Sequence, residues 1–347
     1  MTLRLFLLLA LGLTPALAQS PAPAPVPAPA PPQTYALLVG GLTGPEAYGK
    51  WYPDWLHRFQ VYLTDTVHVP GDHVTVLSGP AATSDAITTA LGKIAKETQP
   101  QDQVILFIVG HGEIRGDVPT LTLPGPDLTA PQLAALLKAI PAKSQVVLNF
   151  SASSGDFLKL LSAPGRINLT AVSPTENQEP VFAEFFLRGL ESKRADQDKN
   201  GTITLLEAYN WAAQQTAWWI ARWTQSDAGD KSDPTSPTTW KASGKETVEI
   251  FQKLYADLPM RKLDPTSDAK ADDAPVALQP PDGQVTGDWA NRRVVDEHAL
   301  LEDSGEGIGV SVITDKGIIQ PILGQKPGDP GYVAAHTSLG QPAPATP

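Results

Sequence analysis

Apolar residues occur in short unbroken runs along the first half of the chain. The most prominent run is Val104–Val109, in which apolar residues follow one another without alternation. This pattern is typical of a strand that is buried on both faces of a sheet. Shorter runs of the same kind predict four further strands, at Tyr35–Val39, Val74–Leu77, Val146–Phe150 and Ile167–Val172.

Segments with helical periodicity separate these runs. In Tyr48–Val67, for example, Trp55, Phe59 and Leu63 recur at four-residue spacing and define one apolar face. Strands that alternate with helices of this length predict an α/β fold, with a mainly parallel sheet covered by helices on both faces. The other predicted helices are one that begins at Thr83 or Ser84, Ala130–Ile140, Val181–Arg194, Leu205–Trp223 and Thr247–Leu258.

The N-terminus resembles an export signal. Met1–Ala18 combines a single basic residue, an apolar stretch and a small-residue cleavage site, which are the parts of a secretory signal peptide. The segment is too short to span a membrane, and no later stretch is long and apolar enough to do so. We therefore expect an exported protein, located in the periplasm, at the cell surface or outside the cell.

Low-complexity sequence divides the remaining chain. Residues 19–33 form a Pro/Ala spacer, which favours the extended polyproline II conformation. Residues 261–292 contain Pro, Asp and Gly throughout, as exposed linkers do. The expected order is a signal peptide at 1–18, a spacer at 19–33, an α/β domain at 34–260, a linker at 261–292, a small C-terminal segment at 293–323 and a disordered tail at 324–347.

Composition excludes cysteine chemistry and argues against one class of partner. The chain of 347 residues has no cysteine, so it can form no disulfide and has no thiol nucleophile. Its net charge of −11 argues against nucleic acid as a partner, because phosphate binding needs a basic surface. An acidic balance is compatible with cations. A peptide or protein ligand is compatible with the sequence, which leaves the ligand's identity and the oligomeric state open.

A calcium-binding loop of the EF-hand type is predicted at Asp196–Glu207. Gly201 stands at the sixth position, where such a loop makes its sharp turn, and Ile203 supplies the apolar residue of the loop. Helical sequence on both sides predicts that 181–223 is an inserted or appended helix-loop-helix of the EF-hand type. The expected calcium ligands, from the first to the last position, are Asp196, Asp198, Asn200, the carbonyl of Thr202 and Glu207, while Thr204 can hold a water.

The alternative interpretation of the same residues is an Asp/Asn/Gly turn that caps the helix beginning at Leu205. EF-hands usually occur in pairs, and the sequence contains no second complete loop. A single loop in an exported protein is therefore expected to lock two helices together rather than to sense a signal.

The Val104–Val109 run ends in Gly110-His111-Gly112. This places His111 at the carboxyl end of a buried strand, which is the edge of an open α/β sheet where ligands bind. The next predicted strand also ends in a turn of small residues, Ser151–Gly155. His111 is thus a candidate catalytic residue, and the alternative is a histidine in a tight structural turn.

The order of these parts resembles the caspase-like, clan-CD cysteine peptidases, and within them the legumain (asparaginyl endopeptidase) family. The similar stretches are YALLVGGLTG, VILFIVGHG, VVLNFSASSG and INLTAVSPTEN, and the resemblance covers about residues 35–190. It implies a caspase/legumain-like fold and a catalytic role for His111. It also places Lys50 where the family has an arginine in its specificity pocket, a replacement that is not conservative for a planar carboxylate or amide clamp.

The nucleophile is where the sequence departs from this family. A legumain-like register places Ala152 at the cysteine position, whereas a caspase-like register places Ser153 there. Alanine performs no covalent chemistry, and a serine needs a strong, oriented general base. The leading interpretation is a calcium-binding pseudo-peptidase that acts by binding. One alternative is a serine-type hydrolase that uses Ser153 and His111, and another is a calcium-stabilised structural or surface protein.

Overall fold

The computed structural model describes residues 31–43, 51–176, 180–226, 297–313 and 321–341, with side chains of the long helix α6 described as far as Ala217. All labelled elements lie in one unit, Pro32–Pro347. The predicted signal peptide, Lys50, the predicted helix Thr247–Leu258 and the predicted linker 261–292 lie outside the described residues. No described helix combines the length and the apolar character that crossing a membrane would require.

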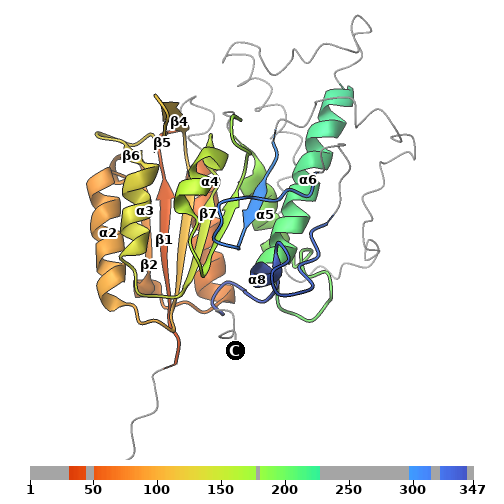
Figure 1. Ribbon diagram of the computed structural model, residues 1–347, viewed down its shortest axis with the longest axis horizontal. Helices are drawn as coiled ribbons and strands as arrows, with labels where there is room; N and C mark the ends of the chain where they lie inside the picture. Colours follow the sequence, from red (N-terminus) through yellow and green to blue (C-terminus); the bar gives the residue numbers. More distant parts are fainter. Residues whose placement is uncertain (1–30, 44–50, 177–179, 227–296, 314–320, 342–347) are drawn as a thin grey trace, which may run out of the picture. The chain divides into compact units, whose positions relative to one another are not determined.

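A six-stranded sheet forms the centre of this unit (Figure 1). The strand order is β2-β1-β3-β7-β8-β9; every adjacent pair is parallel except β8 and β9, which are antiparallel. This arrangement confirms the predicted α/β fold with a mainly parallel sheet. The strands are β1 (Thr34–Gly40), β2 (Val74–Ser78), β3 (Gln103–Val109), β7 (Ser144–Asn149), β8 (Arg166–Thr170) and β9 (Leu300–Glu302).

Helices cover both faces of the sheet, because successive side chains of a buried strand point to opposite faces. Phe107 and Val109 of β3 belong to the hydrophobic cluster that includes α1 (Trp51–Val61), α5 (Phe182–Glu191) and α6 (Leu205–Ser226). Leu106 and Ile108 belong to the opposite cluster. That second cluster includes α2 (Ser84–Glu97), α3 (Ala130–Lys138) and α4 (Ser154–Leu161).

The structure contains elements that the apolar pattern did not predict. A small antiparallel sheet follows the Gly-His-Gly turn and consists of β4 (Gly112–Arg115), β5 (Val118–Leu121) and β6 (Leu128–Thr129). Within the helix predicted at Tyr48–Val67, the α-helical part is α1, and a π-helical turn, η2 (Tyr62–Thr66), follows it directly. The remaining short helices are η3 (Gly71–His73), η4 (Gly79–Ala81) and α8 (Tyr332–Ala335).

The C-terminal part of the chain corrects the predicted domain organisation. The expected separate segment 293–323 contains β9, which pairs with β8 and completes the central sheet. The expected disorder from residue 324 is wrong for the described residues 324–341, because they include α8 and the buried Leu339. The carboxylate of Asp303 accepts the backbone N–H groups of Gly331 and Ala334, which fixes this segment to the sheet.

Candidate functional site

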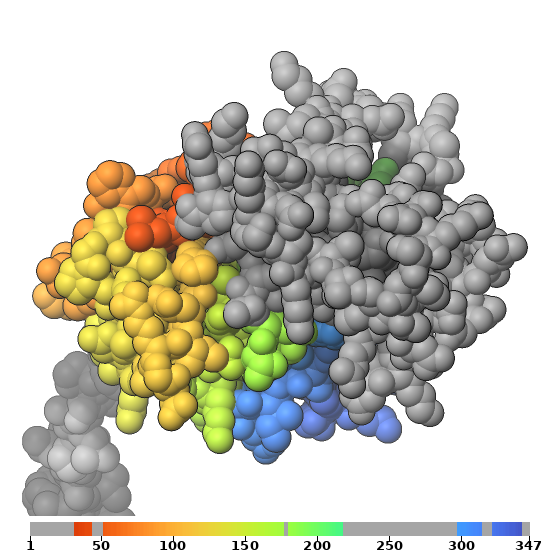
Figure 2. Space-filling model, turned by 90° about the horizontal axis from the view of Figure 1, so that it is seen from above, coloured from red at the N-terminus to blue at the C-terminus, as the bar shows by residue number. Residues whose placement is uncertain are grey.

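The candidate site lies at the carboxyl edge of the sheet, where the chain leaves β1, β3 and β7. The His111 backbone N–H donates to the Leu42 carbonyl at 2.8 Å, and the Ala152 N–H donates to the Gly110 carbonyl at 3.1 Å. The three strand ends are therefore joined by backbone hydrogen bonds. Figure 2 views this edge from above, with the yellow surface of the β4–β5 region beside the red surface that follows β1.

Close backbone packing explains the glycine that follows His111. A Cβ atom added to Gly112 would lie only 2.1 Å from the carbonyl oxygen of Ala152. Gly110, with φ +153°, is similarly placed, because an added Cβ would lie 2.9 Å from the Cα atom of Gly41. Packing alone thus requires a residue without a side chain at these positions. Half-buried His111 lies between them at the predicted strand end.

The serines after β7 are engaged in the turn itself. The Ser153 hydroxyl donates to the Gly112 carbonyl at 3.3 Å, and this side chain is only 1% exposed. The Ser151 hydroxyl donates to Asn149 Oδ1 at 2.7 Å. Ser154 Oγ accepts the backbone N–H groups of Ala171 and Val172, at 3.1 and 3.3 Å. The hydroxyls of Ser153 and Ser154 therefore join the ends of β3, β7 and β8, whereas the Ser151 hydroxyl bonds within the end of β7.

Backbone strain is concentrated in the same turn. Ser153 adopts a left-handed conformation with φ +55° between the end of β7 and the start of α4. A residue other than glycine rarely adopts this conformation, and such strain persists only where the surroundings enforce it. Ala152, the legumain-register candidate, is completely buried beside it. The structure thus places both candidate nucleophile positions close to Gly112, in the packed turn rather than on the surface.

The side chain of Arg58 on α1 points toward helix α5. Arg58 donates from Nε and Nη2 to the two carboxylate oxygens of Glu191, at 2.8 and 2.7 Å, and from Nη1 to Glu184 at 2.8 Å. Burial opposes ionisation of Glu184, but the positive charges of Arg58 and Arg188 hold its pKa below the ordinary value. This network joins α1 to α5 and is a structural feature of the core.

A second polar cluster at the carboxyl edge of the sheet was not predicted from the sequence. The buried carboxylate of Glu297 accepts the backbone N–H groups of Val181 and Phe182, at 3.0 and 2.7 Å, where α5 begins. Burial raises the pKa of Glu297 to about 8, and the negative charge of Glu176 acts in the same direction. Glu176 in turn contacts His298 Nδ1 at 2.5 Å.

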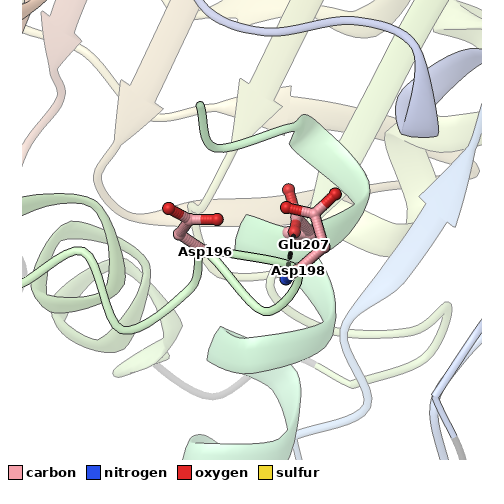
Figure 3. Close-up of side chains that lie close together, drawn as sticks. All are labelled: Asp196, Asp198 and Glu207. Carbon is pink, nitrogen blue, oxygen red and sulfur yellow. Dashed lines mark hydrogen bonds between the residues drawn. The ribbon is translucent and has the colours of Figure 1, made fainter. Parts of the chain in front are cut away.

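The acidic loop between α5 and α6 brings three carboxylates close together. One side-chain oxygen from each of Asp196, Asp198 and Glu207 lies within 4.8 Å of the others (Figure 3). Calcium binds oxygen at about 2.3–2.6 Å, so one ion could contact all three groups. The donor set, carboxylates in a turn that also contains Asn200, fits this hard cation.

Hydrogen bonds hold the loop in a compact turn. Asp196 accepts the N–H groups of Asn200 and Gly201, at 3.1 and 2.9 Å. Glu207 Oε2 accepts the N–H and the hydroxyl of Thr204, at 2.9 and 2.8 Å, and the Glu207 N–H donates back to Thr204 Oγ1 at 3.2 Å. Thr204 and Glu207 therefore cap the start of α6, a role that the alternative interpretation assigned to the Asp/Asn/Gly turn.

Comparison with solved structures gives matches of low identity. A Geobacter sulfurreducens protein solved by structural genomics is 18% identical, over 53% of this chain and 89% of that chain, with a TM-score of 0.41. The Drosophila initiator caspase Dronc is 8% identical, over 53% and 72%, with a TM-score of 0.38. Caspase-1 from Spodoptera frugiperda is 10% identical, over 54% and 77%, with a TM-score of 0.39. No protein-family model and no curated protein match the sequence.

These similarities assign no activity to the chain, because identities of 8–18% and TM-scores of 0.38–0.41 are too low. The α/β architecture rests on the strand order and on the two helical layers described above.

Proposed function

We propose that this chain is an exported, calcium-stabilised protein of caspase/legumain type that has no peptidase activity and acts by binding a peptide or protein. The observation that carries the proposal is the contact between the turns after β3 and β7. There the Ser153 hydroxyl donates to the Gly112 carbonyl, and Ala152 packs against the same glycine. The sequence resemblance and the order of the central strands support the caspase-like part.

The chemistry of the turn argues against covalent catalysis. Ala152 has no nucleophilic atom, and the chain contains no cysteine to take its place. Ser153 would have to break its hydrogen bond to Gly112 and move out of a buried position before it could attack a carbonyl carbon. A weak nucleophile also needs an adjacent, oriented base.

The calcium part of the proposal is supported by the twelve-residue pattern and by the convergence of three carboxylates. Asp196, Asp198, Asn200, the Thr202 carbonyl and Glu207 would hold the ion. When bound, calcium would supply positive charge that neutralises these carboxylates and fixes the connection between α5 and α6. The role assigned to the ion is structural.

A serine-type hydrolase is the second candidate, and the conformation of Ser153 favours it. A strained serine between a buried strand and a helix is also the arrangement of nucleophile elbows, which present Oγ at the carboxyl edge of a sheet. In this hydrolase, Ser153 would be the nucleophile and His111 the base.

A peptide-cleavage assay separates the two candidates. Wild type, Ser153→Ala and His111→Ala are incubated in saturating calcium with a mixed peptide library, and mass spectrometry counts new termini. We expect no cleavage by any of them. Cleavage by the wild type that both substitutions abolish would establish the serine hydrolase instead. The same assay on Ala152→Cys tests whether a thiol at this position produces cleavage. Adding His111→Ala tests whether that cleavage depends on His111.

A further inference from the structure

The acidic loop contains the only Asn-Gly pair of the sequence, Asn200-Gly201. In such a pair the backbone nitrogen of the second residue can attack the side-chain amide carbon of the first and close a five-membered ring. The reaction is intramolecular, so its rate depends on how the surroundings position the groups and where the proton goes.

The loop supplies hydrogen-bond partners to both reacting groups. The attacking nitrogen, that of Gly201, directs its N–H to Asp196 Oδ2 at 2.9 Å. The amide oxygen that would gain negative charge, Asn200 Oδ1, accepts the Thr202 N–H at 2.8 Å. A carboxylate on the attacking N–H is the arrangement of a general base, and an N–H on the developing oxyanion stabilises the charge.

The surroundings also leave room for the ring to form. Asn200 and Gly201 are exposed, and a Cβ atom added to Gly201 would meet nothing within 4 Å. The other asparagines of the described residues, Asn149, Asn168 and Asn210, are 2–4% exposed and precede Phe, Leu and Trp. They provide internal controls in the same molecule.

We propose that Asn200 is a self-modifying site, at which the folded loop promotes succinimide formation and deamidation. The bond from Gly201 N to Asn200 Cγ forms while the bond from Cγ to Nδ2 breaks. The proton of Gly201 N passes to Asp196 and from there to solvent, while the departing nitrogen, which donates to Asp198 Oδ2 at 2.8 Å, takes up a proton from water and leaves as ammonia. Water then opens the succinimide to aspartate or isoaspartate. Either product adds one negative charge to the loop, and isoaspartate also lengthens the main chain by one atom.

The test measures conversion of Asn200 by peptide mapping and mass spectrometry during incubation at neutral pH. All samples contain a chelator, so the result does not depend on whether the loop binds calcium. The folded wild type is compared with the same chain unfolded in urea at equal pH, and Asn200→Asp marks the position of the aspartate product. Because general-base assistance is worth about 10²–10⁴-fold, we expect conversion in the folded chain to be at least about tenfold faster.

Two substitutions test the mechanism. Asp196→Asn removes the acceptor of the Gly201 N–H and should slow conversion in the folded protein by about tenfold or more. Glu97→Gln on α2 removes a charge from an exposed carboxylate outside the loop and should leave the rate unchanged, whereas Asp198 is unsuitable as a control because its Oδ2 accepts the departing Asn200 Nδ2 group at 2.8 Å. Circular dichroism checks that both variants fold. The proposal is overturned if the folded wild type converts no faster than the unfolded chain, a comparison that needs no variant. It is also overturned if Asp196→Asn is folded and reacts at the wild-type rate.

Discussion

The Ser153 hydroxyl donates a hydrogen bond to the Gly112 carbonyl, across the turns that end β7 and β3. This contact joins the two segments in which the sequence places candidate chemistry. A Cβ atom at Gly112 would collide with the neighbouring Ala152 carbonyl, so the approach of the two turns is as close as the backbone allows. The small residues of both turns are therefore explained by packing.

Replacement of Gly112 should destabilise the protein. In Gly112→Ala the added methyl group overlaps a backbone oxygen that cannot move without shifting the end of β7, and we expect a loss of about 1–3 kcal/mol of unfolding free energy. Gly92→Ala is the matched control, because Gly92 lies inside α2 with nothing within 4 Å of the added atom. That substitution should stabilise the protein by about 0.5–1 kcal/mol. Urea unfolding measures both, and equal effects would contradict the packing argument.

Calcium should raise the thermal midpoint of the protein. A ligand that binds only the folded state adds about 2.7 kcal/mol at one hundred times its Kd. Glu207→Gln should remove this calcium dependence, because it replaces the bidentate carboxylate of the proposed loop. Its midpoint without calcium should also change, since Glu207 accepts two hydrogen bonds from Thr204.

The measured quantity is therefore the difference between midpoints with calcium and with chelator. Glu97→Gln on α2 serves as the control, because this exposed carboxylate lies outside the acidic cluster. If chelator leaves the wild-type midpoint unchanged, the loop is only a turn that caps α6.

Stability should fall as pH rises because of Glu297. Burial raises the pKa of this carboxyl group from its ordinary value of 4.5 to about 8 in the folded protein. The folded state thus holds a proton that the unfolded state has already released. The contribution is fully present below pH 4.5 and is lost as pH rises to about 8, with a slope of up to about 1.4 kcal/mol per pH unit.

Glu297→Gln should flatten this part of the pH profile. The glutamine oxygen can still accept the N–H groups of Val181 and Phe182, so the start of α5 keeps its partners. Urea unfolding between pH 5 and pH 9 gives the profile, with the exposed Glu306→Gln as a control. Profiles of equal slope for the wild type and Glu297→Gln would show that Glu297 is ionised throughout this range.

Loss of Arg58 should weaken the connection between α1 and α5. Arg58→Met leaves the nearly buried Glu184 with Arg188 as its remaining ion-pair partner, and we expect a loss of about 1–3 kcal/mol. Arg58→Lys should rescue only part of this loss, because an ammonium group cannot reproduce the paired bonds to Glu191. Arg115→Met is the control; it breaks ion pairs of a side chain that is 59% exposed and should destabilise the protein much less than Arg58→Met. Equal losses for the two methionine variants would contradict the buried network.

Elements with a local signal could be predicted from the amino-acid sequence. The unbroken apolar run of β3 and the stripe of Trp55, Phe59 and Leu63 on the helix that follows β1 are properties of contiguous residues, so they predict buried strands and covering helices correctly. The acidic loop is also local, since its oxygen-bearing residues lie within twelve positions of one another. Their convergence could therefore be predicted, whereas calcium binding remains a prediction.

Features that depend on residues far apart in the chain became apparent in the folded structure. Glu176 and His298 meet although 122 positions separate them, and β9 joins the sheet after a long intervening segment. The predicted disorder after Gly324 failed for a similar reason, because Asp303 supplies hydrogen-bond partners that a Gly- and Pro-rich segment does not contain. Likewise, Gly-His-Gly has the same local pattern whether it presents a catalytic histidine or closes a packed turn. Only the positions of Ala152 against Gly112 and of Gly41 against Gly110 show why those glycines are needed. Steric contact between segments far apart in the chain produces no periodic pattern in the sequence of either segment.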